Sequence, residues 1–266
     1  MIVDGKQIAS EIFADIKARI AKSGTTPELA IITCAPNFET KKYLALKEKK
    51  AAEVGISISV IELEASVTTE DVQKTIAAAA SHAAGIIVQF PLPAHIDATA
   101  VAESIPSTHD VDALSSKTEA VLTPVVGAFK EILDRQGIEV AGKLVTVLGS
   151  GRLVGQPAAK WFTENGAAVS IVTKDTTDVA YYTKQADIIA CGAGDPGFLK
   201  PDMVKDGVII LDAGTSEEGG MLRGDADAAC ATKAALFTPV PGGIGPITVA
   251  LLLRHVVDLS GMDARP

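Results

Sequence analysis

Cysteine is scarce in this chain. Cys34, Cys191 and Cys230 are the three cysteines among 266 residues, they lie far apart, and no C-x-x-C pair occurs. Disulfide-stapled secreted scaffolds and zinc ribbons both need paired or clustered cysteines. Neither class is indicated, and the reducing cytoplasm is the compartment that we expect.

Positive charge is also in short supply. Lys and Arg total 24 against 33 Asp and Glu, which gives a formal net charge of −9. Such a surface repels nucleic-acid phosphates and anionic membranes unless positive residues are clustered locally. The composition therefore favours a small molecule as the partner, with no nucleic acid and no membrane.

Long apolar segments are missing as well. The N-terminus has an acid at Asp4 and lacks the apolar run of a signal peptide. The longest stretch without formal charge, residues 75–96, is rich in alanine and is interrupted by glycine, glutamine and two prolines. A helix, a buried strand and a turn fit this stretch better than a membrane span does.

Alternating helical and strand patterns fill most of the chain. Hydrophobic residues make up 47% of the sequence, which is enough for a sizeable core. In the first third, we expect strands at 28–34, 57–63 and 85–90, and helices at 8–20, 38–54 and from 68 or 69 onward. The order βαβαβ predicts a parallel sheet.

A second α/β series follows a connecting region that contains several prolines. It begins with a helix at about 125–136 and continues with strands at 143–148, 168–172, 187–191 and 208–211. This series has the organisation of a Rossmann-like domain. The sequence therefore predicts the α/β class with two α/β domains.

A glycine turn joins the strand at 143–148 to a helix that runs through Trp161. Gly149 permits a tight turn, and Gly151 lets the backbone approach a pyrophosphate. The helix that follows Gly155 offers free N–H groups to phosphate oxygens. The spacing G-x-G-x-x-x-G is one residue longer than the common dinucleotide fingerprint, so a purely structural turn is the alternative.

The choice of dinucleotide depends on the residues after the strand at 168–172. Lys174 would pair with the 2′-phosphate of NADP, whereas Asp175 would accept a hydrogen bond from the 2′-hydroxyl of NAD. On a third interpretation, both side chains are charges of a solvated loop and neither contacts the ribose. The balance leans slightly to NADP.

Three further segments differ from ordinary packing. Tyr43 and Lys47 lie four residues apart and so share one helix face, although a Tyr/Lys pair on a Lys-rich helix is often merely solvated. Gln89 ends a strand at the carboxyl edge, where α/β sheets bind ligands, unless its amide only caps a loop. The Pro- and Gly-rich segment 238–246 predicts a rigid loop before a helix at 248–259.

Together these motifs resemble the bifunctional methylenetetrahydrofolate dehydrogenase/cyclohydrolase family over nearly the whole chain. Residues 43–47 are similar to the family's Y-x-x-x-K, 88–93 to V-Q-L-P-L-P, and 110–112 to the centre of K-D-V-D-G. Residues 238–246 are similar to T-P-V-P-G-G-V-G-P, and 154–157 to V-G-x-P. The order and spacing of these motifs make the resemblance specific.

The resemblance implies a domain division and an assembly. A folate-binding domain with a parallel sheet would comprise residues 1–121, completed by the C-terminal helix within 241–266. Residues 122–240 would form the Rossmann NAD(P)-binding domain. The family usually forms a homodimer through that domain.

The resemblance also implies two successive reactions of one-carbon metabolism, which feed purine biosynthesis. A hydride would pass from 5,10-methylenetetrahydrofolate to NADP, with NAD as the possible substitute. Water would then open the resulting methenyl cation to 10-formyltetrahydrofolate. Positioning of two rings serves the first step, and proton transfer serves the second.

Roles for individual residues come with the resemblance. Lys47 would move protons, Gln89 would orient Lys47 or the water, and Asp112 would bind the pterin. Tyr43 would stack on the aminobenzoyl ring, and Pro241, Gly242 and Gly243 would line the folate cleft. The cofactor would contact Gly149, Ser150, Gly151, Arg152, Val154, Gly155, Thr173 and Lys174. No metal is expected, and we interpret Asp225 and Asp227 as a turn and surface element.

The sequence departs from the family pattern at several site positions. Ser150 replaces an arginine that is often associated with the NADP phosphate, so Lys174 or Arg152 would have to supply the charge. Ala113 stands where the family has glycine, and His109 stands where it has lysine. These changes leave open a member with one activity only, or a non-catalytic nucleotide- or folate-binding module.

Overall fold

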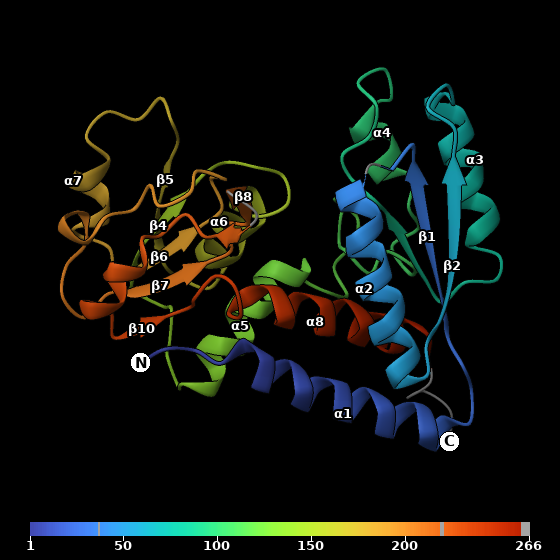
Figure 1. Cartoon of the computed structure of the whole chain (residues 1–266), viewed down its shortest axis with the longest axis horizontal. Coiled ribbons are helices and arrows are strands. Elements are labelled where there is room, and N and C mark those ends of the chain that lie inside the picture. The colour runs from blue at the N-terminus through green and yellow to red at the C-terminus, as the bar shows by residue number, and fades with distance from the viewer. Residues whose placement is uncertain (37, 219–220, 262–266) are drawn as a thin grey trace. The chain divides into compact units, whose positions relative to one another are not determined.

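The computed structural model describes residues 1–36, 38–218 and 221–261, apart from the side chains of residues 38–40, 42, 43 and 218 (Figure 1). The chain divides into two compact units. Unit 1 comprises residues 1–9 and 125–248, and unit 2 comprises residues 10–124 and 249–266. Each unit is built on a parallel sheet, so the predicted α/β class with two α/β domains is confirmed.

Unit 2 contains a three-stranded sheet in the order β2-β1-β3. Its strands are β1 (Glu28–Cys34), β2 (Ser57–Leu63) and β3 (Gly85–Val88), and all pair in parallel. The bounds of β1 and β2 match the prediction. Strand β3 ends two residues early, before Gln89, although the Gln89 N–H still donates to the Ile32 carbonyl at 2.8 Å.

Helices α2 (Phe38–Val54) and α3 (Thr69–Ala79) connect these strands, as the βαβαβ prediction requires. Val72 and Ile76 of α3 pack against the face of the sheet formed by Ala30, Ile32 and Val88. A short helix that was not predicted, α4 (Ala98–Glu103), adds Val101 to this core. Apolar burial on both faces explains why β1 is an almost continuous hydrophobic run.

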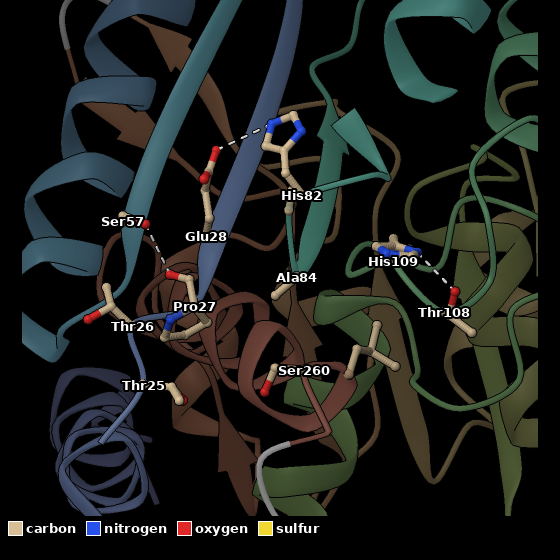
Figure 2. A pocket seen from close by; sticks show the side chains of 12 residues that line it. Thr25, Thr26, Pro27, Glu28, Ser57, His82, Ala84, Thr108, His109 and Ser260 are labelled. Carbon is tan, nitrogen blue, oxygen red and sulfur yellow. Dashed lines mark hydrogen bonds and ion pairs between the residues drawn. The ribbon is translucent and has the colours of Figure 1, made fainter. Parts of the chain in front are cut away.

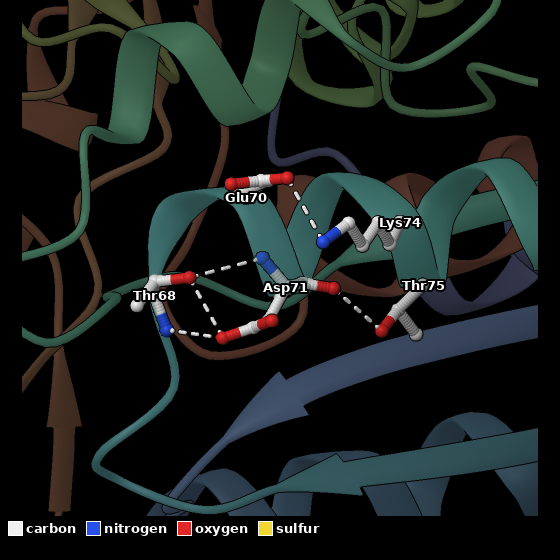
Figure 3. Close-up of polar contacts among 5 residues, drawn as sticks. All are labelled: Thr68, Glu70, Asp71, Lys74 and Thr75. Atoms are coloured by element: carbon white, nitrogen blue, oxygen red, sulfur yellow. Dashed lines mark hydrogen bonds and ion pairs between the residues drawn. The ribbon is translucent and has the colours of Figure 1, made fainter.

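The start of α3 is fixed by a capping box, which Figure 3 shows. The Thr68 hydroxyl accepts from the Asp71 N–H at 3.2 Å, and the Asp71 carboxylate accepts from the Thr68 N–H at 3.0 Å. Two N–H groups that lack a partner within the helix are thereby satisfied. The predicted cap at 68 or 69 is confirmed at Thr68.

Unit 1 contains a five-stranded parallel sheet in the order β10-β7-β6-β4-β5 (Figure 1). The strands are β4 (Leu144–Leu148), β5 (Ala168–Val172), β6 (Ile188–Cys191), β7 (Ile209–Asp212) and β10 (Leu236–Phe237). The four strands predicted for this region are confirmed to within one residue. Strand β10 was not predicted, because a two-residue strand leaves no periodicity to detect.

Short elements connect these strands. They are α6 (Gly155–Glu164), α7 (Val179–Thr183), the 3-10 helices η1 (Pro201–Met203) and η2 (Ala228–Thr232), and an antiparallel hairpin of β8 (Ser216–Glu218) and β9 (Met221–Arg223). The hairpin was not predicted either. The order of β5, β4 and β6 places a topological switch point beside β4, where open α/β sheets bind ligands.

Three long helices complete the chain: α1 (Gly5–Ser23), α5 (Pro124–Arg135) and α8 (Ile244–Leu259). Within the described ranges, no helix combines the length and the apolar character that a membrane span requires. Helix α8 begins four residues before the predicted 248, so that prediction was wrong. Pro246 lies in the first turn, where its missing N–H costs no hydrogen bond.

The compact units differ from the predicted division at the N-terminus and at residues 241–248, which the prediction assigned to the folate-binding domain but which group with unit 1. The Val3 N–H donates to the Phe237 carbonyl, and the Phe237 N–H donates to the Met1 carbonyl, each at 2.9 Å. The first residues thus extend the sheet of unit 1 next to β10. For this reason residues 1–9 group with 125–248, whereas the prediction placed them with residues 10–121.

Candidate active site

Lys47 belongs to the buried stripe of α2. Leu44, Lys47, Ala51 and Val54 follow one another at helical spacing, and all four are buried. Only 4% of the Lys47 surface is exposed. The alternative interpretation of a solvated lysine on a charged helix is therefore wrong for Lys47.

The Gln89 side chain meets Lys47 at the carboxyl end of β3. Lys47 Nζ donates to Gln89 Oε1 at 3.2 Å, while Gln89 Nε2 donates to the Phe90 carbonyl at 2.9 Å. Because a carbonyl only accepts and an ammonium only donates, these two partners fix the orientation of the amide. Gln89 thus presents an oxygen to the lysine, and does more than cap a loop.

Asp112 lies in a turn that follows the segment paired with β3. The Ile86 N–H donates to the His109 carbonyl at 2.7 Å, so residues 109 and 110 run beside the strand. Asp112 comes two residues later and is partly buried. This arrangement brings the Asp112 carboxyl group into the electrostatic field of Lys47.

The pKa values of Lys47 and Asp112 depend on burial and on each other's charge. Burial lowers the pKa of Lys47, and the negative charge of Asp112 opposes that shift. Burial also raises the pKa of Asp112, and the positive charge of Lys47 opposes that shift. A desolvated amine beside an amide and a carboxyl group can accept a proton and return it. Lys47 can therefore act as a general acid–base group.

The turn that carries Asp112 is organised by Asp110. The fully buried Asp110 carboxylate accepts from the Leu114 N–H at 3.1 Å, the Ser115 N–H at 2.8 Å and the Thr118 hydroxyl at 2.7 Å. Burial raises the pKa of Asp110, and these hydrogen bonds oppose that rise. Ala113 within the turn has a φ of 50°, in the left-handed region that favours glycine.

Tyr43 occupies the turn of α2 that precedes Lys47. Its side chain lies outside the described residues, so its expected stacking role stays a prediction.

The polar cavity shown in Figure 2 lies at the opposite edge of the unit 2 sheet. It has a volume of about 460 Å³ and is lined by the amino ends of β1 and β2, by residues 82–84 before β3, and by the end of α8. His82 Nε2 lies 3.6 Å from the Glu28 carboxylate there, and His109 hydrogen-bonds to Thr108. Because Gln89 follows the carboxyl end of β3, this cavity is separate from the Lys47 site.

In unit 1, the glycine turn has the tight geometry that its sequence predicts. Gly149 has a φ of 98°, and a Cβ on it would lie 2.6 Å from the Gly192 carbonyl oxygen. A Cβ on Gly155 would lie 2.2 Å from the Gly149 oxygen. Both positions therefore require glycine, whereas Gly151 faces open space within the described part of the chain.

The remaining residues predicted to bind cofactor lie in two places: Ser150, Gly151, Arg152 and Val154 belong to this turn, and Thr173 and Lys174 follow β5. Ser150, Gly151 and Arg152 are exposed, and Val154 precedes the first turn of α6. Thr173 forms a local turn in which its N–H donates to the Thr176 hydroxyl at 3.0 Å. Lys174, which follows it, is exposed.

The segment Pro241-Gly242-Gly243 also belongs to unit 1 and leads into α8. The Gly242 carbonyl accepts from the Gly5 N–H at 3.0 Å, and the Gly243 N–H donates to the Pro239 carbonyl at 2.7 Å. A Cβ on Gly243 would lie 2.6 Å from that same oxygen. The segment is thus a tightly bonded turn, and its role toward folate stays a prediction.

Two family models match this chain. Residues 3–112 match the catalytic domain of tetrahydrofolate dehydrogenase/cyclohydrolase, and residues 121–263 match the NAD(P)-binding domain of that family. The chain belongs to the tetrahydrofolate dehydrogenase/cyclohydrolase family. The resemblance that the motifs indicated is confirmed.

Individual members of the tetrahydrofolate dehydrogenase/cyclohydrolase family align over almost the full chain. The bifunctional protein FolD of Halothermothrix orenii is 36% identical over 274 residues, which covers 96% of each chain. The crystal structure of the Campylobacter jejuni FolD enzyme has a TM-score of 0.93 at 32% identity and covers 98% of each chain. The Trypanosoma brucei enzyme, solved with NADP and an inhibitor, has a TM-score of 0.91 at 31% identity, with 100% of this chain and 99% of that chain covered.

One interpretation of this family member's sequence was wrong. Asp225 was taken as part of a surface turn, yet it is fully buried. Its carboxylate accepts from the N–H groups of Ala193, Gly194 and Asp195 at 2.7, 3.2 and 2.9 Å. Asp225 thus shapes the loop after β6, and Gly192 at the start of that loop abuts the glycine turn.

Asp212 is a second buried acid that the sequence did not single out. It ends β7, and its carboxylate accepts from the N–H groups of Gly214, Asp225 and Ala226 at 2.9, 3.2 and 2.8 Å. Burial, with a further contribution from the charge of Asp225, raises the pKa of Asp212 to about 6. The available signal was its place at the carboxyl end of a predicted strand.

Proposed function

We propose that the chain oxidises 5,10-methylenetetrahydrofolate to 5,10-methenyltetrahydrofolate and hydrolyses the latter to 10-formyltetrahydrofolate. Membership of the tetrahydrofolate dehydrogenase/cyclohydrolase family supports both activities. The observation that carries the assignment is the buried Lys47 in contact with Gln89 and in the field of Asp112.

The hydrolysis needs one proton acceptor at the reacting carbon. The oxygen of water bonds to the carbon that bridges N5 and N10 of the methenyl cation, and one water proton passes to the neutral amine of Lys47. The hydroxyl proton of the adduct then leaves as the C=O bond forms, the bond from carbon to N5 breaks, and N5 takes up a proton. The sum is methenyl cation plus water giving 10-formyltetrahydrofolate plus one released proton.

The surroundings of Lys47 suit this task. Burial lowers its pKa, so a larger fraction of the side chain is neutral near pH 7 than in a solvated lysine. A cationic substrate nearby disfavours the ammonium form further. Gln89 Oε1 holds the nitrogen in place by the 3.2 Å hydrogen bond, and Asp112 accepts from the N–H edge of the pterin.

NADP is the cofactor that we assign to the first reaction. When bound, it accepts the hydride from the methylene carbon. Gly149 and the start of α6 would receive the pyrophosphate, because the turn is tight and the helix N-terminus attracts anions. Lys174 or Arg152 would supply the positive charge that the family's arginine brings at the position of Ser150, and the Trypanosoma brucei relative, solved with NADP, supports NADP over NAD.

We also propose a homodimer in the cytoplasm that serves one-carbon metabolism and purine biosynthesis. Unit 1 exposes large apolar side chains on the edge strand β5 and on β9, namely Ile171, Met221 and Leu222. An interface between two copies would remove these apolar side chains from water, which favours association. Light scattering on the wild-type chain and on a Met221→Lys variant checks the dimer, which the variant should weaken.

Turnover of wild-type protein tests the proposed function. Methylenetetrahydrofolate with NADP and, separately, with NAD should give methenyltetrahydrofolate, whose loss in a second assay measures hydrolysis. Both activities with NADP are expected. If only hydrolysis is found, the chain is a cyclohydrolase whose unit 1 has a structural role only. If only oxidation is found, the chain is a dehydrogenase. The absence of both activities would overturn the assignment.

A further inference from the structure

His255 of α8 reaches the turn that carries Asp112. Its side chain is 5% exposed, and its Nδ1 lies 2.8 Å from the Val111 carbonyl oxygen, 144 residues away in sequence. Because that oxygen only accepts, Nδ1 must carry the proton. Burial lowers the pKa of His255, so the ring is a neutral donor.

The Val111 carbonyl belongs to the peptide group that ends at the Asp112 nitrogen. A hydrogen bond to this oxygen therefore fixes the plane from which the Asp112 side chain departs. The Val111 side chain is fully buried, and a Cβ on Gly85 would lie 2.6 Å from its Cγ1. The residue before Asp112 is thus held through both its backbone and its side chain.

The other end of the turn is held by Asp110, through its bonds to Leu114, Ser115 and Thr118. Ala113 lies between these restraints in the left-handed region, which L-residues rarely adopt. A strained backbone persists only where the surroundings over-determine it. The Asp110 carboxylate also accepts from the Asp112 N–H, so Asp110 holds the nitrogen end of the Val111–Asp112 peptide and His255 holds its oxygen.

We propose that His255 is a positioning residue for Asp112, holding the Val111–Asp112 peptide so that the carboxyl group meets the pterin. This inference rests on the proposed function, in which Asp112 binds the folate. Both reactions use the same pterin, so a loosened Asp112 weakens both. Unit 1 keeps its glycine turn, so NADP binding is spared.

Two substitutions separate positioning from packing. His255→Leu keeps most of the apolar volume and removes the donor. His255→Asn places an amide N–H close to the position of Nδ1 and restores the bond. His82→Leu is the control, because the His82 side chain is exposed and lies near Ser81 and Glu28, not the Val111 carbonyl.

The measurements are the KM for methylenetetrahydrofolate, the KM for methenyltetrahydrofolate, the Kd of NADP and the melting temperature of the full chain. His255→Leu should raise both folate KM values roughly five- to tenfold, the change expected if the free energy of one buried hydrogen bond is lost from folate binding. The Kd of NADP should stay within about twofold, and His255→Asn should restore both KM values.

Unchanged folate KM values in His255→Leu would overturn the inference, even if the melting temperature fell. Equal impairment of His255→Asn and His255→Leu would overturn it too. If His255→Leu does not fold, His255→Gln replaces it. The glutamine side chain is one methylene longer, so its amide N–H extends past the position of Nδ1 and does not replace that donor. If the wild-type protein turns over neither folate, the proposed function is overturned. That outcome differs from unchanged KM values in His255→Leu, which would overturn the inference about His255 only.

Discussion

The two units use buried carboxylates for the same purpose but in different electrostatic settings. In unit 2, Asp110 shapes the turn that carries Asp112, and Lys47 supplies a positive charge to that site. In unit 1, Asp225 and Asp212 shape the loops after β6 and β7, and the negative charge of Asp225 adds to the rise in the pKa of Asp212. The first setting creates a proton-transfer site, and the second builds a scaffold around the glycine turn.

This difference predicts which activity each region controls. In unit 2, a change that disturbs Asp112 should impair both reactions, because both use the same pterin. Loss of the Lys47 amine should impair hydrolysis. A change at the carboxylates of unit 1 should affect the reaction that needs NADP. Substitutions in the two units therefore test the comparison directly.

The largest effect is expected for Lys47→Met. The variant keeps the length of the side chain and loses the amine, so hydrolysis of methenyltetrahydrofolate should fall about 10²- to 10⁴-fold, the usual contribution of a general acid–base group. Lys49→Met is the matched control, because Lys49 lies on the same helix and is exposed. Hydrolysis at the wild-type rate in Lys47→Met would refute the role of the amine.

Asp110→Ala and Asp225→Ala form the next pair, since each removes a buried acceptor of three hydrogen bonds. Leaving buried donors unpaired should lower the melting temperature by roughly 5–10 °C in both variants. At a temperature where both are folded, Asp110→Ala should impair both activities. Asp225→Ala should impair oxidation and leave hydrolysis near the wild-type rate.

Asp227→Ala is the control for Asp225→Ala. Asp227 is partly exposed and accepts from the Ala229 N–H at the start of η2, so its loss should cost about 1 kcal/mol and spare both activities. Equal loss of hydrolysis in Asp110→Ala and Asp225→Ala would break the proposed division between the units.

A smaller effect concerns the pH dependence of stability. The pKa of Asp212 is about 6 in the folded chain against 3.8 in its ordinary state, so the native state binds this proton first as pH falls. Its contribution to the free energy of unfolding therefore decreases as pH rises from about 4 to 6, by up to about 3 kcal/mol. Melting temperatures of wild type and Asp212→Asn across this range should diverge, and parallel curves would contradict the shift.

The smallest effect is expected at the capping box of α3. Thr68→Ala removes the hydroxyl that accepts from the Asp71 N–H and should lower stability by about 1 kcal/mol. Because the Thr68 hydroxyl bonds to Asp71 within the first turn of α3, the KM values should not change. Thermal unfolding measures the first expectation and steady-state kinetics the second.

The strands of the fold were predictable because their apolar runs are long enough to show a period. Strands β1 and β2 were placed to the residue, whereas β10 and the β8–β9 hairpin are too short to be detected. The start of α8 was misplaced because Gly245 and Pro246 look like loop residues. Only the geometry reveals that they form a first helical turn.

The chemistry at the candidate site was less predictable. Motifs singled out Lys47 and Gln89, but a sequence cannot tell a buried lysine from a solvated one on a helix with many charges. Asp225 was misread because acidic residues are mostly exposed. Its burial depends on three backbone groups about thirty residues away, and no local pattern encodes such contacts.

The most direct test of the account is the pH dependence of methenyltetrahydrofolate hydrolysis. If the desolvated Lys47 amine accepts the proton, kcat/KM should rise with pH along a limb whose apparent pKa lies below the ordinary lysine value of 10.5. Lys47→Met should lack that limb. A wild-type profile without it, or the same limb in Lys47→Met, would contradict the assignment of the proton transfer to Lys47.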